Sequence, residues 1–381
     1  MTREEVLRKA VEGRITWLQA AEICRITPRH LLRLREQYQA LGREGLRDRR
    51  AGRRQPLRIP VATLDELCRL KREVYPDFSI RHFYEFATEK HGLKLSYTLT
   101  RNVLQMRGLV EKAPGRGKYR RRRERRPMRG MLVHLDASTH PWIGGLPPQD
   151  LVVALDDADG RILFARFFAQ EGVFSTLWSV RAVLQRHGRF CELYTDRGSH
   201  FCHTTRAGED PDAVQLGQVP RVLQALGIRQ ILARSPEARG RSERCFGTIQ
   251  GRLPQELRLH GIDTYAAANA YLAQVFVPDF NRRFAVVPQQ PETAFTSTRG
   301  LDLELVLSVQ HERQVGKDNT VQFEHLALQL APTTARAHFA RCPVVVHEFL
   351  DDTLGVSYQG RLVARFDRTG LPLSATRRKA A

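Results

Sequence analysis

The stretch "MLVHLDAST", residues 131–139, is a short apolar run that contains one carboxylate near its end. A run of this length and composition predicts a buried β-strand. The segment "DLVVALDDADGRILFARFFA" (150–169) predicts two strands folded at residues 157–160, because Asp and Gly favour tight turns. "FCELYTDRG" (190–198) and "IRQILARS" (228–235) predict a fourth and a fifth strand.

Helical patterns separate the later strands. "FSTLWSVRAVLQRHG" (174–188) is amphipathic, a second helix is expected near residues 213–226, and a third follows the fifth strand. Three strands in a meander, followed by helix, strand, helix, strand and helix, is the order of an α/β ribonuclease-H-like domain. We therefore expect such a core over residues 131–295, completed by two helices within 255–284.

Three acidic residues occupy particular positions of that predicted core. Asp136 ends the first strand, Asp196 ends the fourth in "YTDRGSHF", and Glu243 lies on the last helix in "SPEARGRSERCFGTI". Because the first and fourth strands end side by side in this fold, these carboxylates should converge into a divalent-metal site. Mg²⁺ prefers such oxygen ligands, with Mn²⁺ as a substitute, and two ions together can drive an in-line phosphodiester displacement. For Asp196, simple turn chemistry is the alternative.

Two neighbouring features have simpler interpretations. "LDDADG" (155–160) lacks the ligand pattern of a calcium loop and predicts a hairpin turn. His134, His140 and His200 lie near the acids, and a packing or solvent role is favoured for them over contact of His200 with a substrate.

The charge of the chain is concentrated in its first third. The whole chain carries 61 Lys and Arg against 41 Asp and Glu, and residues 1–130 hold 33 of the basic and 15 of the acidic residues. Such a cationic segment gains affinity for nucleic acid by counterion release. A solvated charged surface and an anionic-membrane patch are the alternatives. There is no long apolar run and no C-x-x-C pair, so we expect a cytoplasmic protein without membrane contact, disulfide framework or zinc finger.

Residues 1–50 predict a helix-turn-helix module. The apolar spacing indicates three short helices, with Thr16 capping the second, and Thr27 and Pro28 beginning the third. The third helix would present basic residues to a major groove, while a helical bundle with a basic solvated face is the alternative. These residues are Arg29, His30, Arg33 and Arg35.

A second module of the same kind is expected over residues 51–110. Its helices would cover 62–75, 79–92 and 96–108, and Arg101 on the last suits DNA contacts. The linker over 111–130 is strongly basic and should follow a DNA backbone, most of all through Arg120, Arg121, Arg122 and Arg123. Beyond the core, alternating patterns in residues 296–381 predict a small β-barrel that helps to bind DNA or a neighbouring subunit.

At its acidic stretches the sequence resembles the bacterial insertion-sequence transposases of the retroviral-integrase superfamily, most like those of the ISNCY group. The resemblance rests on the stretches "HLDAST", "YTDRGSHF" and "SPEARGRSERCFGTIQGRL". The resemblance implies binding of double-stranded DNA at terminal inverted repeats, and Mg²⁺-dependent 3′-end cleavage and strand transfer by Asp136, Asp196 and Glu243. It also implies a homo-oligomer, at least a dimer, in the active complex. In the family the Glu follows a Gly by three residues, which selects Glu243 over Glu237.

The sequence departs from the family pattern in two places. The interval between Asp196 and Glu243 is long, with "HTTRAGEDPDAVQ" (203–215) as the apparent insertion. Many relatives carry a basic residue one or two turns after the Glu, where this chain has Gly247, Thr248 and Gln250. Either Arg244 or Arg252 takes that role here, or the contact is absent. A metal-dependent nuclease of the same fold and a non-catalytic DNA-binding regulator are the alternative functions.

Overall fold

The computed structural model describes residues 2–46, 59–111, 124–202, 217–233, 240–333 and 336–373. The chain divides into two compact units, Met1–Cys68 and Arg69–Ala381. Several predicted features lie outside the described residues: Arg120, Arg121, Arg122 and Arg123, the insertion at 203–215, and Glu237. Among the helices that are described, none has the length and apolar character needed to span a membrane.

The first unit begins with the three predicted short helices, α1 (Arg3–Val11), α2 (Trp17–Cys24) and α3 (Pro28–Leu41), followed by a 3₁₀ turn at Gly42–Leu46. Thr16 accepts a hydrogen bond from Gln19 N, and the Gln19 side chain accepts one from Thr16 N at 2.9 Å, which closes a capping box. Thr27 caps α3 in the same way and Pro28 begins it. Both predicted N-caps are therefore confirmed.

A second helical region follows, with α4 (Val61–Arg69), its π-helical continuation Leu70–Val74, α5 (Ile80–Glu89) and α6 (Tyr97–Met106). Ser79 caps α5 and Ser96 caps α6 through bonds from His82 N and Leu99 N, each 3.3 Å. The buried ammonium of Lys71 donates to three backbone carbonyl oxygens in the loop that follows the π turn, which satisfies its donors. The three helices thus form close to the predicted positions.

The core sheet has the strand order expected from the sequence, β3-β2-β1-β4-β5. Its strands are β1 (Leu132–His140), β2 (Gln149–Asp156), β3 (Ile162–Phe168), β4 (Glu192–Thr195) and β5 (Arg229–Leu232). The first three are antiparallel, whereas β4 runs parallel to β1 and β5 parallel to β4. The predicted turn between β2 and β3 is confirmed, with Gly160 at a positive φ of 73°.

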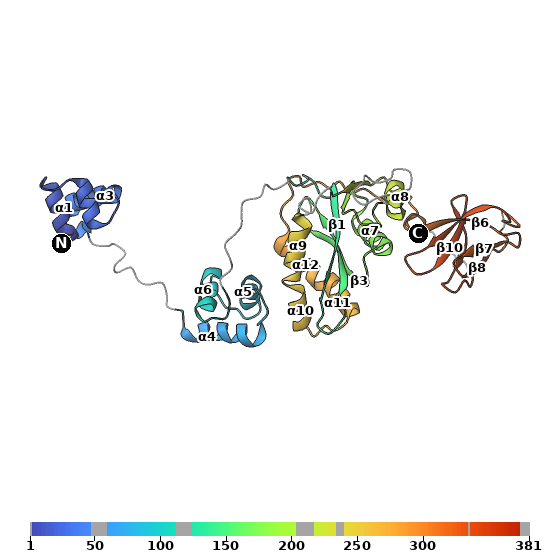
Figure 1. Cartoon of the computed structure of the whole chain (residues 1–381), viewed down its shortest axis with the longest axis horizontal. Coiled ribbons are helices and arrows are strands. Elements are labelled where there is room, and N and C mark those ends of the chain that lie inside the picture. Colours follow the sequence, from blue (N-terminus) through green and yellow to red (C-terminus); the bar gives the residue numbers. More distant parts are fainter. Residues whose placement is uncertain are drawn as a thin grey trace. The chain divides into compact units, whose positions relative to one another are not determined.

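Helices cover both faces of this sheet (Figure 1). One face packs on α7 (Val173–His187) and α8 (Gln218–Ala225), and the other on α9 (Gly240–Gln250), α10 (Leu253–Leu259), α11 (Tyr265–Tyr271) and α12 (Val277–Phe284). Along β2, Val152 contributes to the first core, and Leu151 and Val153 to the second, because successive side chains of a strand point to opposite faces. A π turn at Leu272–Phe276 joins α11 to α12, so 255–284 ends in one continuous helical stretch.

The described strands of the C-terminal region do not close into a barrel, so the small β-barrel predicted for residues 296–381 is not confirmed. After α13 (Leu303–Val306), its described strands are β6 (Val309–Gln314), β7 (Thr320–Phe323), β8 (Leu326–Gln329), β9 (Pro343–Glu348), β10 (Leu354–Tyr358) and β11 (Arg361–Phe366). They build a four-stranded sheet, β11-β10-β9-β6, and a separate hairpin, β7-β8. Apolar side chains of both, including Val321 and Val346, share one core. The hairpin strands are four residues long and pair with each other, so the sheet stays open.

Candidate active site

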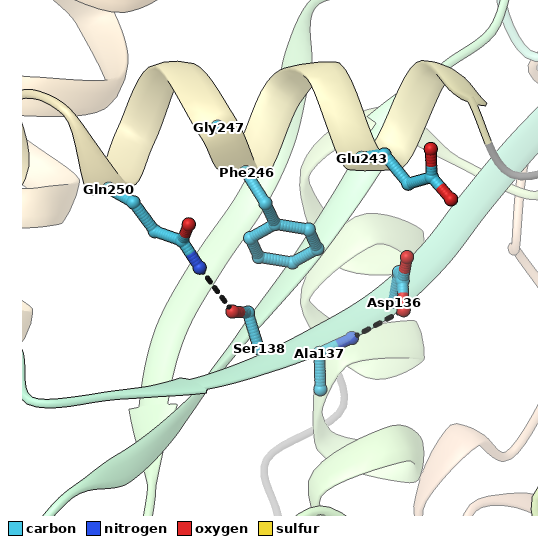
Figure 2. A pocket seen from close by; sticks show the side chains of 7 residues that line it. All are labelled: Asp136, Ala137, Ser138, Glu243, Phe246, Gly247 and Gln250. Carbon is cyan, nitrogen blue, oxygen red and sulfur yellow. Dashed lines mark hydrogen bonds between the residues drawn. The ribbon is translucent and has the colours of Figure 1, made fainter.

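Two of the three predicted acids line one hollow. Its volume is about 360 Å³, and its walls come from β1 and α9. The lining residues are Asp136, Ala137, Ser138, Glu243, Phe246, Gly247 and Gln250. Figure 2 shows Asp136 on the strand and Glu243 on the helix, at the same end of this hollow. Residues more than a hundred positions apart therefore face a common space.

Both acids lie on elements that the core holds firmly. Asp136 is 8% exposed, it pairs with Val153 across β1 and β2, and its Oδ1 accepts a hydrogen bond from Ala137 N at 3.0 Å. Glu243 is exposed and lies in the first turn of α9, where the helix dipole favours an acid. Phe246, which also lines the hollow, and Ile249 pack α9 into the core. An open carboxylate thus projects from a well-packed helix.

The third acid, Asp196, follows the last residue of β4. The parallel register pairs His134 with Tyr194, so two residues further along Asp136 and Asp196 are level with each other. However, Asp196 Oδ1 accepts a hydrogen bond from Gly198 N at 2.8 Å, and Asp196 is not among the residues that line the hollow. Within the described parts of the chain, no three His, Cys, Asp or Glu side chains are grouped closely enough to hold a metal ion. The structure therefore brings Asp136 and Glu243 together, and leaves Asp196 in a turn.

The far end of the hollow is polar but uncharged. Gln250 Nε2 donates to Ser138 Oγ at 2.9 Å, which joins α9 to β1 (Figure 2). Of the two arginines considered for gripping DNA beyond the Glu, Arg244 is exposed on α9. Arg252 is 7% exposed and bonded to Glu85, so it is not available to a substrate. The alternative that assigned Arg252 to DNA is therefore wrong.

The turn between β2 and β3 holds a buried acidic cluster that the sequence did not reveal. Asp156 and Asp157 are both 0% exposed. Burial raises the pKa of Asp156 to about 6, although Gly130 N and Ala158 N donate to its carboxylate. Burial alone would also raise the pKa of Asp157, but hydrogen bonds from His134, from the Arg126 amide and from Arg241 hold it well below its usual range.

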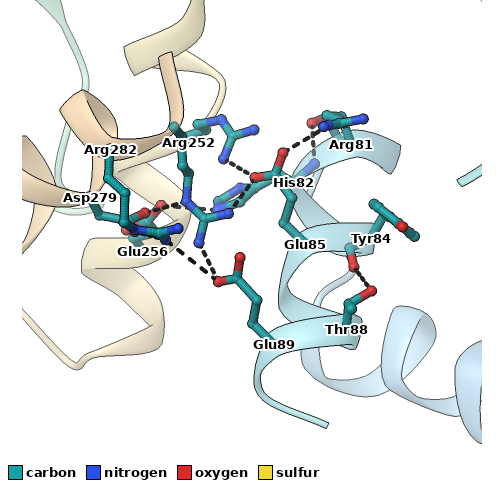
Figure 3. A network of polar contacts seen from close by, with 12 residues as sticks. Arg81, His82, Tyr84, Glu85, Thr88, Glu89, Arg252, Glu256, Asp279 and Arg282 are labelled. Carbon is teal, nitrogen blue, oxygen red and sulfur yellow. Dashed lines mark hydrogen bonds and ion pairs between the residues drawn. The ribbon is translucent and has the colours of Figure 1, made fainter. Parts of the chain in front are cut away.

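A second charged network joins α5 to the core helices α10 and α12 (Figure 3). Glu85 Oε2 accepts from Arg252 Nη1 at 2.8 Å and from Arg283 Nη1 at 3.1 Å. Beside them, His82 Nε2 lies 3.0 Å from Oε1 of Glu256. The other oxygen of this carboxylate, Oε2, accepts a hydrogen bond from the Tyr271 hydroxyl. Burial lowers the pKa of His82, so its ring donates to Glu256 as a neutral imidazole. Partners this distant in sequence carry no local signal.

The predicted DNA-contacting residues of the helical regions differ in exposure. Arg29, His30 and Arg33 are exposed on α3, and Arg101 is exposed on α6. Arg35 is partly buried, and its guanidinium carbon lies 5.2 Å from the centre of the Trp17 ring. A cation–π contact of this kind orients Arg35 along its own module. Of the four residues of α3 predicted to contact DNA, three are therefore fully exposed, and Arg35 is only partly accessible.

Comparison with known proteins agrees with the predicted helix-turn-helix module. Residues 2–54 match the family model described as a helix-turn-helix domain. The protein y4bF from Sinorhizobium fredii, named as a transposase, is 31% identical over 364 residues, which cover 94% of this chain and 79% of that protein. This chain belongs to the same family of bacterial transposases. The transposase for insertion sequence IS1202 from Streptococcus pneumoniae is 26% identical to the present transposase. The match covers 84% of this chain and 76% of the Streptococcus protein.

Solved structures give more distant similarities to this transposase. A chain of the simian T-cell lymphotropic virus intasome in complex with PP2A regulatory subunit B56 gamma has a TM-score of 0.36 at 14% identity, covering 77% of this chain and 98% of that one. The HTLV-2 integrase catalytic core domain in complex with magnesium has a TM-score of 0.28 at 16% identity, covering 39% and 89%. At such scores neither similarity carries weight for the chemistry.

Proposed function

We propose that this transposase binds the terminal inverted repeats of its own element, cleaves the phosphodiester at the 3′ ends and joins the freed 3′-hydroxyls to target DNA. The observation that carries the proposal is the hollow in which Asp136 of β1 and Glu243 of α9 face the same space. The membership of the chain in a transposase family supports it. Assignment to the ISNCY group remains a prediction.

The residues of the hollow suit a hard divalent cation. Mg²⁺ is commonly held by one or two carboxylates and keeps waters or phosphate oxygens in its remaining positions, so Asp136 and Glu243 satisfy its minimum. Asp196, level with Asp136 on the adjacent strand, would complete the set by leaving its bond to Gly198 N. Mg²⁺ or Mn²⁺, as one ion or two, would supply activation of the attacking oxygen and stabilisation of the leaving oxygen.

The residues of this chain would hold and orient the DNA. Carboxylates on a strand and a helix that are both packed in the core keep their positions during the reaction, which favours an in-line arrangement. Ser138 and Gln250 at the far end offer neutral polar groups beside the cleaved strand. Arg29, His30 and Arg33 of the first module, and Arg101 of α6, would contact the repeat. Joining two ends requires at least two copies of the chain.

A strand-transfer assay tests the proposal. Purified protein, a labelled duplex that carries the element end and a supercoiled target are incubated with Mg²⁺ or Mn²⁺. We expect joined product from the wild type, and a loss of at least about a thousandfold for Asp136→Asn and Glu243→Gln with DNA binding retained. Asp263→Asn, an exposed acid outside the hollow, is the control and should keep full activity.

Asp196→Asn separates the two interpretations of that residue. An amide oxygen can still accept the bond from Gly198 N, so the turn survives the substitution, whereas a metal ligand does not. Loss of joining in this variant assigns Asp196 to the metal, and retained joining makes it a turn residue. Cleavage without joining by the wild type would favour the nuclease, and binding without either reaction would favour the regulator.

A further inference from the structure

Helix α9 is tied to the sheet by a polar contact at each end. At its C-terminal end, Gln250 donates to Ser138 of β1. At its N-terminal end, Arg241 Nη1 donates to the carboxylate of Asp157 and, at 3.1 Å, to the Asp157 backbone oxygen. Glu243 lies two residues after Arg241, in the same turn of the helix. The contact with Asp157 is thus the one nearest to the proposed catalytic Glu.

The same carboxylate oxygen of Asp157 also contacts β1. His134 Nε2 lies 2.7 Å from Asp157 Oδ1, and His134 precedes Asp136 by two residues on the strand. Residues two apart on a strand point to the same face of the sheet, so the side chains of His134 and Asp136 lie on the same face of β1. One oxygen of Asp157 therefore bridges a residue two before Asp136 and a residue two before Glu243.

The environment of Asp157 makes this bridge stiff. Both His134 and Asp157 are at most 2% exposed, and the Arg241 side chain is 18% exposed. The second oxygen, Oδ2, accepts from Arg126 N at 2.7 Å. A buried carboxylate whose two oxygens are both bonded, and whose charge is opposed by an arginine, has few alternative arrangements. Loss of this carboxylate would remove the side-chain link between Arg241 of α9 and His134 of β1, and would leave Arg241 its bond to the Asp157 backbone oxygen.

We propose that Asp157 is a positioning residue, which fixes the first turn of α9 against β1 so that Glu243 faces Asp136. The proposal rests on the proposed function for its consequence in catalysis, but not for its geometry. Asp157 does not line the hollow and would not touch the DNA or the metal. It acts through Arg241 on one side and His134 on the other.

The adjacent Asp156 is a matched control. It lies on the same turn and is equally buried, but its carboxylate accepts from the backbone of Gly130 and Ala158. Asp156→Asn therefore removes a buried charge beside the site while leaving the bridge to α9 in place. Arg241→Ala breaks the same bridge from the other side, at a residue that is less buried than Asp157 and hence less apt to prevent folding.

Hydrogen–deuterium exchange of the metal-free protein measures the bridge without any activity. We expect the first protected amides of α9, residues 244–247, which bond to the carbonyls of its first turn, to exchange about tenfold faster in Asp157→Ala and in Arg241→Ala, because local opening becomes easier. Asp156→Asn should leave the protection of this turn unchanged. Equal protection of the turn in wild type and Arg241→Ala, or an equal loss in Asp156→Asn, would overturn the proposal.

The Mg²⁺ dependence of end cleavage measures the consequence. The half-saturating Mg²⁺ concentration should rise about tenfold or more in Asp157→Ala and Arg241→Ala, the range seen when outer contacts of a metal site are removed. The double variant should be no worse than either single one, because both break one contact. An unchanged Mg²⁺ dependence in both would overturn the positioning role. If exchange in α9 were faster in the variants but the wild type never cleaved DNA, the bridge would be supported and the proposed function refuted.

Discussion

Two carboxylates lie at the first turn of α9. Glu243 belongs to this turn, and Asp157 bonds it through Arg241. Asp157 is fully buried, and its oxygens accept from His134, Arg126 N and Arg241. Glu243 is exposed and lines an open hollow together with Asp136. The donors around an acid decide what it can do: a carboxylate already bonded to fixed donors holds structure, whereas one that faces a hollow can accept a cation.

The contact between α5 and the core extends the comparison to a second region. Glu85 is 8% exposed, and it accepts from Arg81, Arg252 and Arg283. Burial would raise the pKa of Glu85, but these arginines lower it, with Arg252 the strongest. Glu85 therefore belongs with Asp157, and loss of its partners should cost stability, whereas the exposed Glu243 should be removable without such a cost.

The largest expected effect on stability comes from removing the most buried partner of Glu85. In Arg252→Ala the buried carboxylate keeps Arg81 and Arg283 but loses the arginine that compensates most of its charge. We expect the free energy of unfolding to fall by about 3 kcal/mol. Urea unfolding, monitored by fluorescence of the buried Trp142 and the partly buried Trp178, measures it.

An exposed pair on the same helix provides the control. Arg258 bonds Asp77 at 2.7 Å, but their side chains are 50% and 40% exposed. Arg258→Ala should cost less than about 1 kcal/mol, because solvent already screens this pair. Equal losses for Arg252→Ala and Arg258→Ala would show that burial does not set the strength of these contacts.

A smaller and pH-dependent effect is expected at Asp156. Burial raises its pKa from 3.8 to about 6, so the folded protein binds its proton more tightly than the unfolded chain does. The stability contributed by the protonated form is complete below about pH 4 and is lost as the pH rises through about 6. Between about pH 5 and about pH 7.5 the wild type should lose about 1 kcal/mol that Asp156→Asn does not lose. A wild-type-minus-variant difference that stays constant with pH would contradict the raised pKa.

Much of the fold could be predicted because its signals are local. The caps at Thr16 and Thr27 need only neighbours within three residues, and the apolar runs indicate the strands of the core sheet. The barrel is not confirmed, because alternating patterns predict strands, but closure depends on which strands pair. The open sheet and the separate hairpin are set by pairings such as Val346 with Val356, which no single run encodes.

The candidate site was predictable to the same extent. Asp136 and Glu243 were found because each lies at a defined position of the predicted core. The bond between Arg241 and Asp157 was not found, since 84 positions separate the two residues, and Arg252 and Arg283 lie still further from Glu85 in the sequence. Arg252 was one of the alternatives for a DNA contact because of its position after the Glu, and only the folded chain shows Glu85 beside it. Long-range pairs of opposite charge need the three-dimensional structure.

The smallest stability effect is expected at Glu243 itself. Glu243→Gln alters an exposed side chain of a well-packed helix, so unfolding without metal should change by no more than about 0.5 kcal/mol. A cation that binds only the folded wild type stabilises it in proportion to its saturation, by about 1.4 kcal/mol at ten times the dissociation constant. Millimolar Mn²⁺ should therefore raise the melting temperature of the wild type and leave that of Glu243→Gln nearly unchanged. If Mn²⁺ raised both equally, the cation would be bound elsewhere, and the distinction between the acids of the hollow and the bonded acids would lose its functional meaning.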